Sequence, residues 1–159
     1  MAFTIKSTAF THEKEIPSKY TCEGEDLSPA LSWYDPPKGT MAYALIVDDP
    51  DAPDPRAPKM TWVHWILYNL PTGTQALKEG VAMKELPQGT EEGINDWGNT
   101  GYGGPCPPIG RHRYYFKLYA LSKRLTGIRL PTKKDLEKAM AGSILAQTQM
   151  IGTYEKRNK

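Results

Sequence analysis

The chain has 159 residues, of which 39% are hydrophobic and 24% charged, a composition typical of one globular domain and unlike that of a disordered chain. Its 14 glycines and 14 prolines argue against an all-helical bundle, because both residues break helices. The net charge of +2 comes without a long Lys/Arg run, so nothing indicates nucleic-acid binding. The longest apolar run, Met41 to Val47, is far shorter than the ~20 residues of a membrane span. We therefore expect a single domain over residues 1–159, with neither nucleic acid nor a membrane span.

The N-terminal residues and the two cysteines bear on the compartment. Lys6, His12 and Glu13 stand where a signal peptide would need an apolar core, which predicts a cytoplasmic protein. Cys22 and Cys106 are too few for a disulfide scaffold, and their spacing matches no zinc finger or ribbon. We expect both to be buried thiols, and we expect no cofactor.

Short strands account for most of the first half of the chain. Alternation over Phe3–Ser7 and the apolar content of Ala30–Tyr34 predict two of them. The continuous apolar segment Met41–Asp48 predicts a central strand that is buried on both faces. The four prolines of Asp49–Pro58 then predict a loop that forms neither a helix nor ladder pairing.

Two further strands carry histidines near their starts. Trp62–Leu70 is predicted as a strand, and its period of two groups one face as Trp62, His64, Ile66 and Tyr68. Residues 71–111 show little periodicity and are rich in glycine and proline, so they predict a long irregular connection. The strand His112–Leu121 follows, with a face made of His112, Tyr114, Phe116, Leu118 and Ala120.

Helical spacing appears only near the C-terminus. Thr132 is a predicted N-cap with Asp135 as its partner, ahead of a short helix. Ser143 is predicted to cap a second helix, whose apolar stripe is Ile144, Leu145, Thr148 and Ile151. Strands followed by helices favour a mainly β fold, an antiparallel β-sandwich with short C-terminal helices, over a βαβ array.

Histidines and carboxylates gather at the predicted strand ends. His64 and His112 each begin a strand after a loop, and Asp48, Asp49 and Asp51 stand at the end of another strand. A carboxylate that accepts from one ring nitrogen fixes the tautomer of an imidazole and leaves the other nitrogen free. The alternatives are structural: histidines packed in the core, and aspartates that cap backbone amides of a turn.

The segment from Gly103 to Tyr114 combines glycines with positive charge. Glycines let the backbone approach a ligand, and successive amides in such turns form anion-binding nests. Arg111 and Arg113 flank His112, but the period of two places both of them on the opposite face of the strand.

Three blocks of the sequence resemble the phosphatidylethanolamine-binding protein family, also called Raf kinase inhibitor-like proteins. They are Tyr20–Pro29 with Leu31 and Trp33; Asp49–Pro53 with Trp62–Trp65; and Gly104-Pro105 with Gly110–Tyr114. With the tail Leu145–Tyr154, the resemblance covers nearly the whole chain, and the first block is similar to the bacterial and archaeal branch. Animal members have a second histidine where this chain has Val63.

The resemblance implies a β-sandwich with a small anion-accepting pocket at one end and a cis bond before Pro53. The ligand-binding residues it implies are Asp49, Asp51, Pro53, Trp62, His64, Gly104, Pro105, His112 and Tyr114. It also implies a binding or regulatory role, since members of other branches bind lipid headgroups and regulate kinases, and bacterial relatives look like homodimers. Trp97 is then our candidate for a dimer contact.

The leading hypothesis is a pocket for a small anion or phosphate monoester, in which His64 and His112 donate to phosphate oxygens, Asp49 holds one ring and amides near Gly104 complete the cradle. The first alternative is a hydrolase that uses the same His/Asp pair, with Ser28 or Cys106 as nucleophile by type only; the absence of a G-x-S-x-G elbow or a P-loop favours binding over catalysis. The second is a metal site built from His64, His112, Asp49 and Cys106. The third is an interaction module that inhibits a kinase or protease by protein contact.

Overall fold

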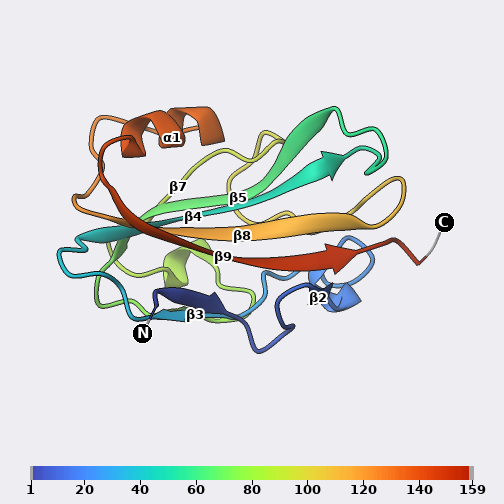
Figure 1. The fold of residues 1–159 in the computed structure, drawn as a ribbon, viewed down its shortest axis with the longest axis horizontal. Helices are drawn as coiled ribbons and strands as arrows, with labels where there is room; N and C mark the ends of the chain where they lie inside the picture. Colours follow the sequence, from blue (N-terminus) through green and yellow to red (C-terminus); the bar gives the residue numbers. More distant parts are fainter. Residues whose placement is uncertain (1, 158–159) are drawn as a thin grey trace.

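The computed structural model describes residues 2–157, which contain two β-sheets and one α-helix joined by loops and two short 3-10 helices (Figure 1). The large sheet has the strand order β2-β9-β8-β4-β5-β7 and the small one β1-β3-β6. All pairings are antiparallel except that of β2 with β9. The elements are β1 (Thr4–Lys6), β2 (Lys14–Glu15), η1 (Ser18–Tyr20), β3 (Leu31–Tyr34), β4 (Ala42–Ala52), β5 (Met60–Pro71), β6 (Ala76–Leu77), η2 (Met83–Glu85), β7 (Glu91–Glu92), β8 (His112–Leu121), α1 (Lys133–Met140) and β9 (Ile144–Tyr154).

The large sheet is buried on both faces, which explains why its central strands are almost continuously apolar. One face packs on the small sheet, where Trp33 meets Tyr43 edge to face at 5.6 Å. The other face packs on α1, whose Leu136 and Met140 are fully buried in a second cluster with Ile46. Figure 1 shows α1 on one side of the large sheet and β1 with β3 on the other. The fold is therefore a sandwich with one helix as an outer layer.

The five main predicted strands are confirmed, but the proline-dense loop begins later than predicted. β4 continues through Asp49 to Ala52, with Asp49 opposite Trp62 and Ala52 opposite Met60. Pro50 falls in the register irregularity between these two pairs, where no ladder bond needs its missing N–H. The extension carries the aspartates to the end of the sandwich.

A β-bulge in β5 corrects the predicted face of this strand. Val47 lies opposite Trp65 and Asp48 opposite Val63, so His64 is an extra residue between the two pairs. Ile66 therefore packs in the cluster under α1, whereas the His64 ring contacts Tyr114 of β8 at 5.2 Å on the other face. The predicted grouping of His64 with Ile66 and Tyr68 is wrong, because a bulge shifts the alternation by one residue.

The C-terminal region contains one predicted helix and one strand. Thr132 caps α1, with its hydroxyl accepting from the Asp135 N–H and the Asp135 carboxylate accepting from the Thr132 N–H. The second predicted helix is wrong: Ile144–Tyr154 is β9, which pairs with the whole length of β8. Ladder pairing along a ten-residue strand overrides the helical spacing of four apolar residues. No helix among residues 2–157 has the length and apolar content needed to cross a membrane.

Candidate ligand-binding pocket

A pocket of about 410 Å³ opens where β4 ends and where β5 and β8 begin. β5 and β8 flank β4 in the sheet and run antiparallel to it. The end of β4 and the starts of β5 and β8 therefore lie at the same end of the sheet. The lining residues come from these ends and from two loops. They are Asp49, Ala52, Pro53, Met60, Trp62, His64, Trp97, Cys106, Pro107, Pro108 and Tyr114.

The three clustered aspartates of β4 have separate partners. Alternation along the strand separates Asp48 from Asp49, and the register irregularity after Asp49 separates Asp51 from Asp49. Asp48 is buried on the α1 side, where Lys117 and Lys133 approach its Oδ2 atom to 3.0 and 2.7 Å. Asp49 points toward the pocket. Asp51 accepts two hydrogen bonds from the guanidinium of Arg113 and one from its backbone N–H. Their mutual repulsion is thus offset by separate counter-charges.

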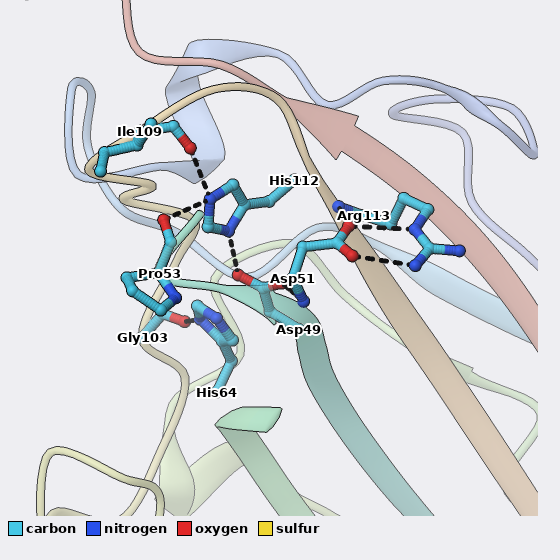
Figure 2. Close-up of polar contacts among 8 residues, drawn as sticks. All are labelled: Asp49, Asp51, Pro53, His64, Gly103, Ile109, His112 and Arg113. Atoms are coloured by element: carbon cyan, nitrogen blue, oxygen red, sulfur yellow. Dashed lines mark hydrogen bonds and ion pairs between the residues drawn. The ribbon is translucent and has the colours of Figure 1, made fainter. Parts of the chain in front are cut away.

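Asp51 therefore holds the chain together at the pocket's edge and does not line the pocket. The hydrogen bonds and charge of Arg113 lower the pKa of Asp51, so the ion pair persists at neutral pH. This pair ties the end of β4 to the start of β8. Arg113 lies on the side of β8 opposite His112, as the strand period predicts (Figure 2).

His112 has both ring nitrogens occupied by protein oxygens (Figure 2). Nδ1 lies 2.6 Å from Asp49 Oδ2, and Nε2 lies 2.8 Å from the Ile109 carbonyl oxygen and 3.0 Å from that of Pro53. Because these oxygens only accept, both nitrogens carry hydrogen and the ring is an imidazolium. Burial lowers the pKa of His112, but the hydrogen bond to Asp49 and its charge raise that pKa above the ordinary value overall. His112 has no free N–H to offer a ligand, contrary to the hypothesis from sequence.

His64 has one ring nitrogen occupied and one free. Its Nδ1 donates to the Gly103 carbonyl oxygen at 2.7 Å, which fixes the tautomer and leaves Nε2 as a bare lone pair. The residue is 3% exposed, and Nε2 has no hydrogen-bond partner among residues 2–157. Burial lowers the pKa of His64 and outweighs the charges of the nearby aspartates, so the ring is neutral at pH 7.

Tyr114 presents the second unpaired polar atom of the pocket. Its hydroxyl is buried and has no partner within the described part of the chain. Burial, with the charge of Asp49, raises the pKa of Tyr114 far above the usual value, so the hydroxyl keeps its proton. The aromatic rings of Trp62 and Trp97 pack edge to face at 5.6 Å, and Trp97 also packs on His64 at 5.1 Å. The pocket thus joins two polar atoms to aromatic and proline walls.

Gly104 and Pro105 support the loop and do not line this pocket. The Gly104 N–H donates to Asp26 Oδ1 at 2.9 Å, and the Pro105 carbonyl accepts from the Cys22 N–H at 3.1 Å. A Cβ at position 104 would collide with that same Asp26 oxygen and with the Tyr20 carbonyl, so only glycine fits. The Gly104 N–H, which was predicted to bind an anion, is therefore already bonded to the carboxylate of Asp26.

Cys22 and Cys106 form a disulfide, and both are exposed, so the expectation of buried thiols is wrong. The fold brings together two residues that lie 84 positions apart, with their Cα atoms 5.4 Å from each other. This separation along the sequence is the reason that spacing alone indicates nothing. Cys106 forms part of the pocket wall, so the disulfide anchors that wall to the segment after η1.

Of the nine predicted site residues, five line the pocket: Asp49, Pro53, Trp62, His64 and Tyr114. The bond before Pro53 is cis, as the resemblance implies. Four lining residues were not predicted from the sequence: Ala52, Met60, Pro107 and Pro108. Trp97 was named only for a dimer contact, and the DWG turn within a glycine-rich stretch was the one signal for it. Two of the four ligands in the predicted metal site are not available, because both ring nitrogens of His112 are hydrogen-bonded and Cys106 is in a disulfide. The described residues contain no group of three or more His, Cys, Asp or Glu placed to hold a metal ion.

Comparison with known proteins agrees with this architecture. The family model for phosphatidylethanolamine-binding protein matches residues 6–155. The chain belongs to this family. A UPF0098 protein of Aquifex aeolicus is 46% identical over 157 residues, which cover 96% of this chain and 88% of that protein. A phosphatidylethanolamine-binding protein homologue of Chlamydia trachomatis is 41% identical, with a TM-score of 0.88 and 98% of each chain covered. YbcL of Escherichia coli, described as a new member of the mammalian family, is 29% identical, with a TM-score of 0.87, and the match covers 98% of this chain and 99% of YbcL. These relatives place the chain in the bacterial and archaeal branch of the family.

Proposed function

We propose that this protein binds a small oxyacid group, a phosphate on a small molecule or on a protein, in the pocket at the end of the sandwich, and that its role is regulatory. One observation carries the proposal. Two polar atoms, His64 Nε2 and the Tyr114 hydroxyl, are buried without partners among residues 2–157, and both belong to side chains that line one pocket. A buried unpaired polar group costs about 1–3 kcal/mol, and a ligand that pairs with both atoms recovers that cost.

The other residues around these two atoms have two roles, structural support and apolar contact with the ligand. The Asp49–His112 ion pair carries no net charge and holds the ends of β4 and β8 together. Trp62, Trp97 and the prolines of the loop offer apolar surface to the part of the ligand that carries the oxyacid. In this revised form of the hypothesis, ligand recognition belongs to His64 and Tyr114, and the His/Asp pair is their support.

The protein has three histidines, and NMR of their rings during titration with inorganic phosphate tests the proposal directly. We expect the His64 ring signals and the Tyr114 signals to shift together and saturate. His12 lies on the surface near β9, with its Nδ1 accepting from the Ile151 N–H, and serves as an internal control. If His64 and His12 respond alike, or neither saturates, the pocket is not a phosphate site.

Contact with a target protein is the second candidate function, and one observation favours it. Met60, Trp97 and Ile109 lie beside the pocket or in its wall and are each more than 40% exposed, an unusual concentration of large apolar side chains. An inhibitor of a kinase or protease could use this rim. Replacing Ile109 with serine separates the two candidates, because Ile109 is exposed and does not line the pocket, so the change weakens protein contact and leaves phosphate binding in place. The hydrolase alternative has no comparable support, since His112 is fully hydrogen-bonded and Cys106 is in a disulfide.

The compartment and the oligomeric state are also part of the proposal. We propose a cytoplasmic homodimer with Trp97 near the contact. A disulfide is uncommon in reducing cytosol outside hyperthermophiles, so cell fractionation is the sharper of the two tests. Light scattering of purified wild-type protein and of the Trp97→Ser variant tests the dimer.

A further inference from the structure

The free nitrogen of His64 accepts hydrogen bonds and does not donate them. Its Nδ1 lies 2.7 Å from the Gly103 carbonyl oxygen, which can only accept, so the proton of the neutral ring resides on Nδ1. Nε2 therefore keeps its lone pair, which has no partner among the described residues, on a side chain that lines the pocket. The oxygens of a fully ionised anion carry only lone pairs, and they repel such an atom.

The charges around His64 do not convert it into a cation. Asp49 on β4 is paired with the His112 imidazolium of β8, and Asp48 lies on the other face of β4 between two lysines. Asp26, from the loop after η1, accepts from the Gly104 N–H. Tyr114 on β8 keeps its proton. Among the described residues that line the pocket there is no lysine or arginine. Burial thus prevails, and it lowers the pKa of His64.

The Tyr114 hydroxyl supplies the complementary donor. Its ring lies edge to face with that of His64, at 5.2 Å between centroids, and both residues line the same pocket. A matching ligand head must therefore donate one hydrogen bond and accept another. Such a head is an acid that still carries a proton.

We propose that the pocket selects the proton-bearing form of an oxyacid: the ligand's own O–H donates to His64 Nε2, and a second ligand oxygen accepts from the Tyr114 hydroxyl. This inference rests on the proposed function and narrows it. Inorganic phosphate and the monoanion of a phosphate monoester carry the required hydroxyl. Sulfate, ionised carboxylates and phosphate diesters lack it and are rejected.

Calorimetry of the wild-type protein at pH 7.5 with inorganic phosphate and with sulfate tests this selection, because the two ions share size and shape and differ in the proton. We expect phosphate to bind at least tenfold more tightly. We also expect the ¹⁵N signal of His64 Nε2 in the phosphate complex to remain that of a nitrogen without hydrogen. Equal affinities, with His64 becoming an imidazolium in both complexes, overturn the inference and leave the proposed function standing. No binding of either ion removes both.

Further ligands and a variant of His64 test the same selection. Phenyl phosphate and methyl phenyl phosphate at pH 5.5 are both mainly monoanions, but only the monoester has a P–OH, so we expect the monoester alone to bind. A phosphoserine peptide in parallel shows whether the pocket accepts the group from a protein chain. The His64→Gln variant offers an amide N–H as well as an oxygen, and we expect its preference for phosphate over sulfate to fall below threefold. A variant that keeps the full preference contradicts the role given to Nε2.

Discussion

The unpaired hydroxyl of Tyr114 leads to a test in which losing a polar group stabilises the protein. Tyr114 is 1% exposed, and its hydroxyl has no partner among the described residues. The Tyr114→Phe variant removes this oxygen and keeps the ring that packs on His64. Because an unsatisfied buried polar group costs about 1–3 kcal/mol, we expect the free energy of unfolding to rise by about 1 kcal/mol. For a domain of this size, such a change raises Tm by about 2–4 °C.

Tyr154 provides a matched control on the neighbouring strand. It is also fully buried and lies opposite His112 in the pairing of β8 with β9, but its hydroxyl donates to Glu23 Oε1 at 2.6 Å. A hydrogen bond to a charged group contributes about 1.5–3 kcal/mol, so Tyr154→Phe should lower the free energy of unfolding by that amount. Urea unfolding of the two variants and the wild type measures both changes under one set of conditions.

Opposite signs for the two variants support the reasoning, and Tyr114→Phe should also bind phosphate more weakly than the wild type. That combination, a more stable protein with a weaker ligand interaction, is characteristic of a group kept for binding. If Tyr114→Phe lowers the free energy of unfolding as much as Tyr154→Phe does, the Tyr114 hydroxyl has a partner in the folded protein. It is then not available to a ligand, and this result contradicts the proposed binding mode.

The two buried histidines should make the free energy of unfolding depend on pH in opposite directions. With its pKa lowered in the folded state, His64 reduces stability as pH falls below the ordinary value of about 6.5, and His64→Phe should remove this acid limb in urea titrations. With its pKa raised, His112 adds stability that is present below about 6.5 and is lost as pH rises through its folded pKa, and Asp49→Asn should flatten this alkaline limb. Reduction of the disulfide, which joins residues 84 positions apart, should cost about 4–5 kcal/mol, measured by urea unfolding with and without dithiothreitol. Gly104→Ala should lower the free energy of unfolding by about 1–3 kcal/mol in thermal melts, whereas Gly73→Ala, with open space around it, should change it by less than about 0.5 kcal/mol.

The sequence predicts the sandwich well because its strongest signals are local. The apolar run Met41–Asp48 predicts a strand that is buried on both faces, and the large sheet buries β4 between the small sheet and α1. The alternation from His112 onward predicts the buried face of β8. The Thr132–Asp135 cap also depends only on neighbours three residues apart. These features needed no knowledge of distant contacts.

Features that depend on distant pairing were not predictable in the same way. Ile144–Tyr154 has helical spacing, yet the hydrogen bonds of β8 make it a strand. The extra residue at His64 becomes visible only when the opposite strand is placed beside it. The disulfide joins two loops whose approach is set by the whole fold.

The two histidines show most clearly where sequence reasoning ends. Both begin strands after loops, and both are followed by apolar residues at every second position, so nothing local separates them. Their roles diverge because Asp49 is within reach of one ring only. His112 takes that carboxylate and two carbonyl oxygens, which fills its hydrogen-bonding capacity and leaves it charged. His64, displaced by the bulge, receives one carbonyl and keeps an open lone pair. A ligand that needs an acceptor thus has one imidazole to bind, and substitution of His64 should abolish ligand selectivity, whereas substitution of His112 should first destabilise the fold.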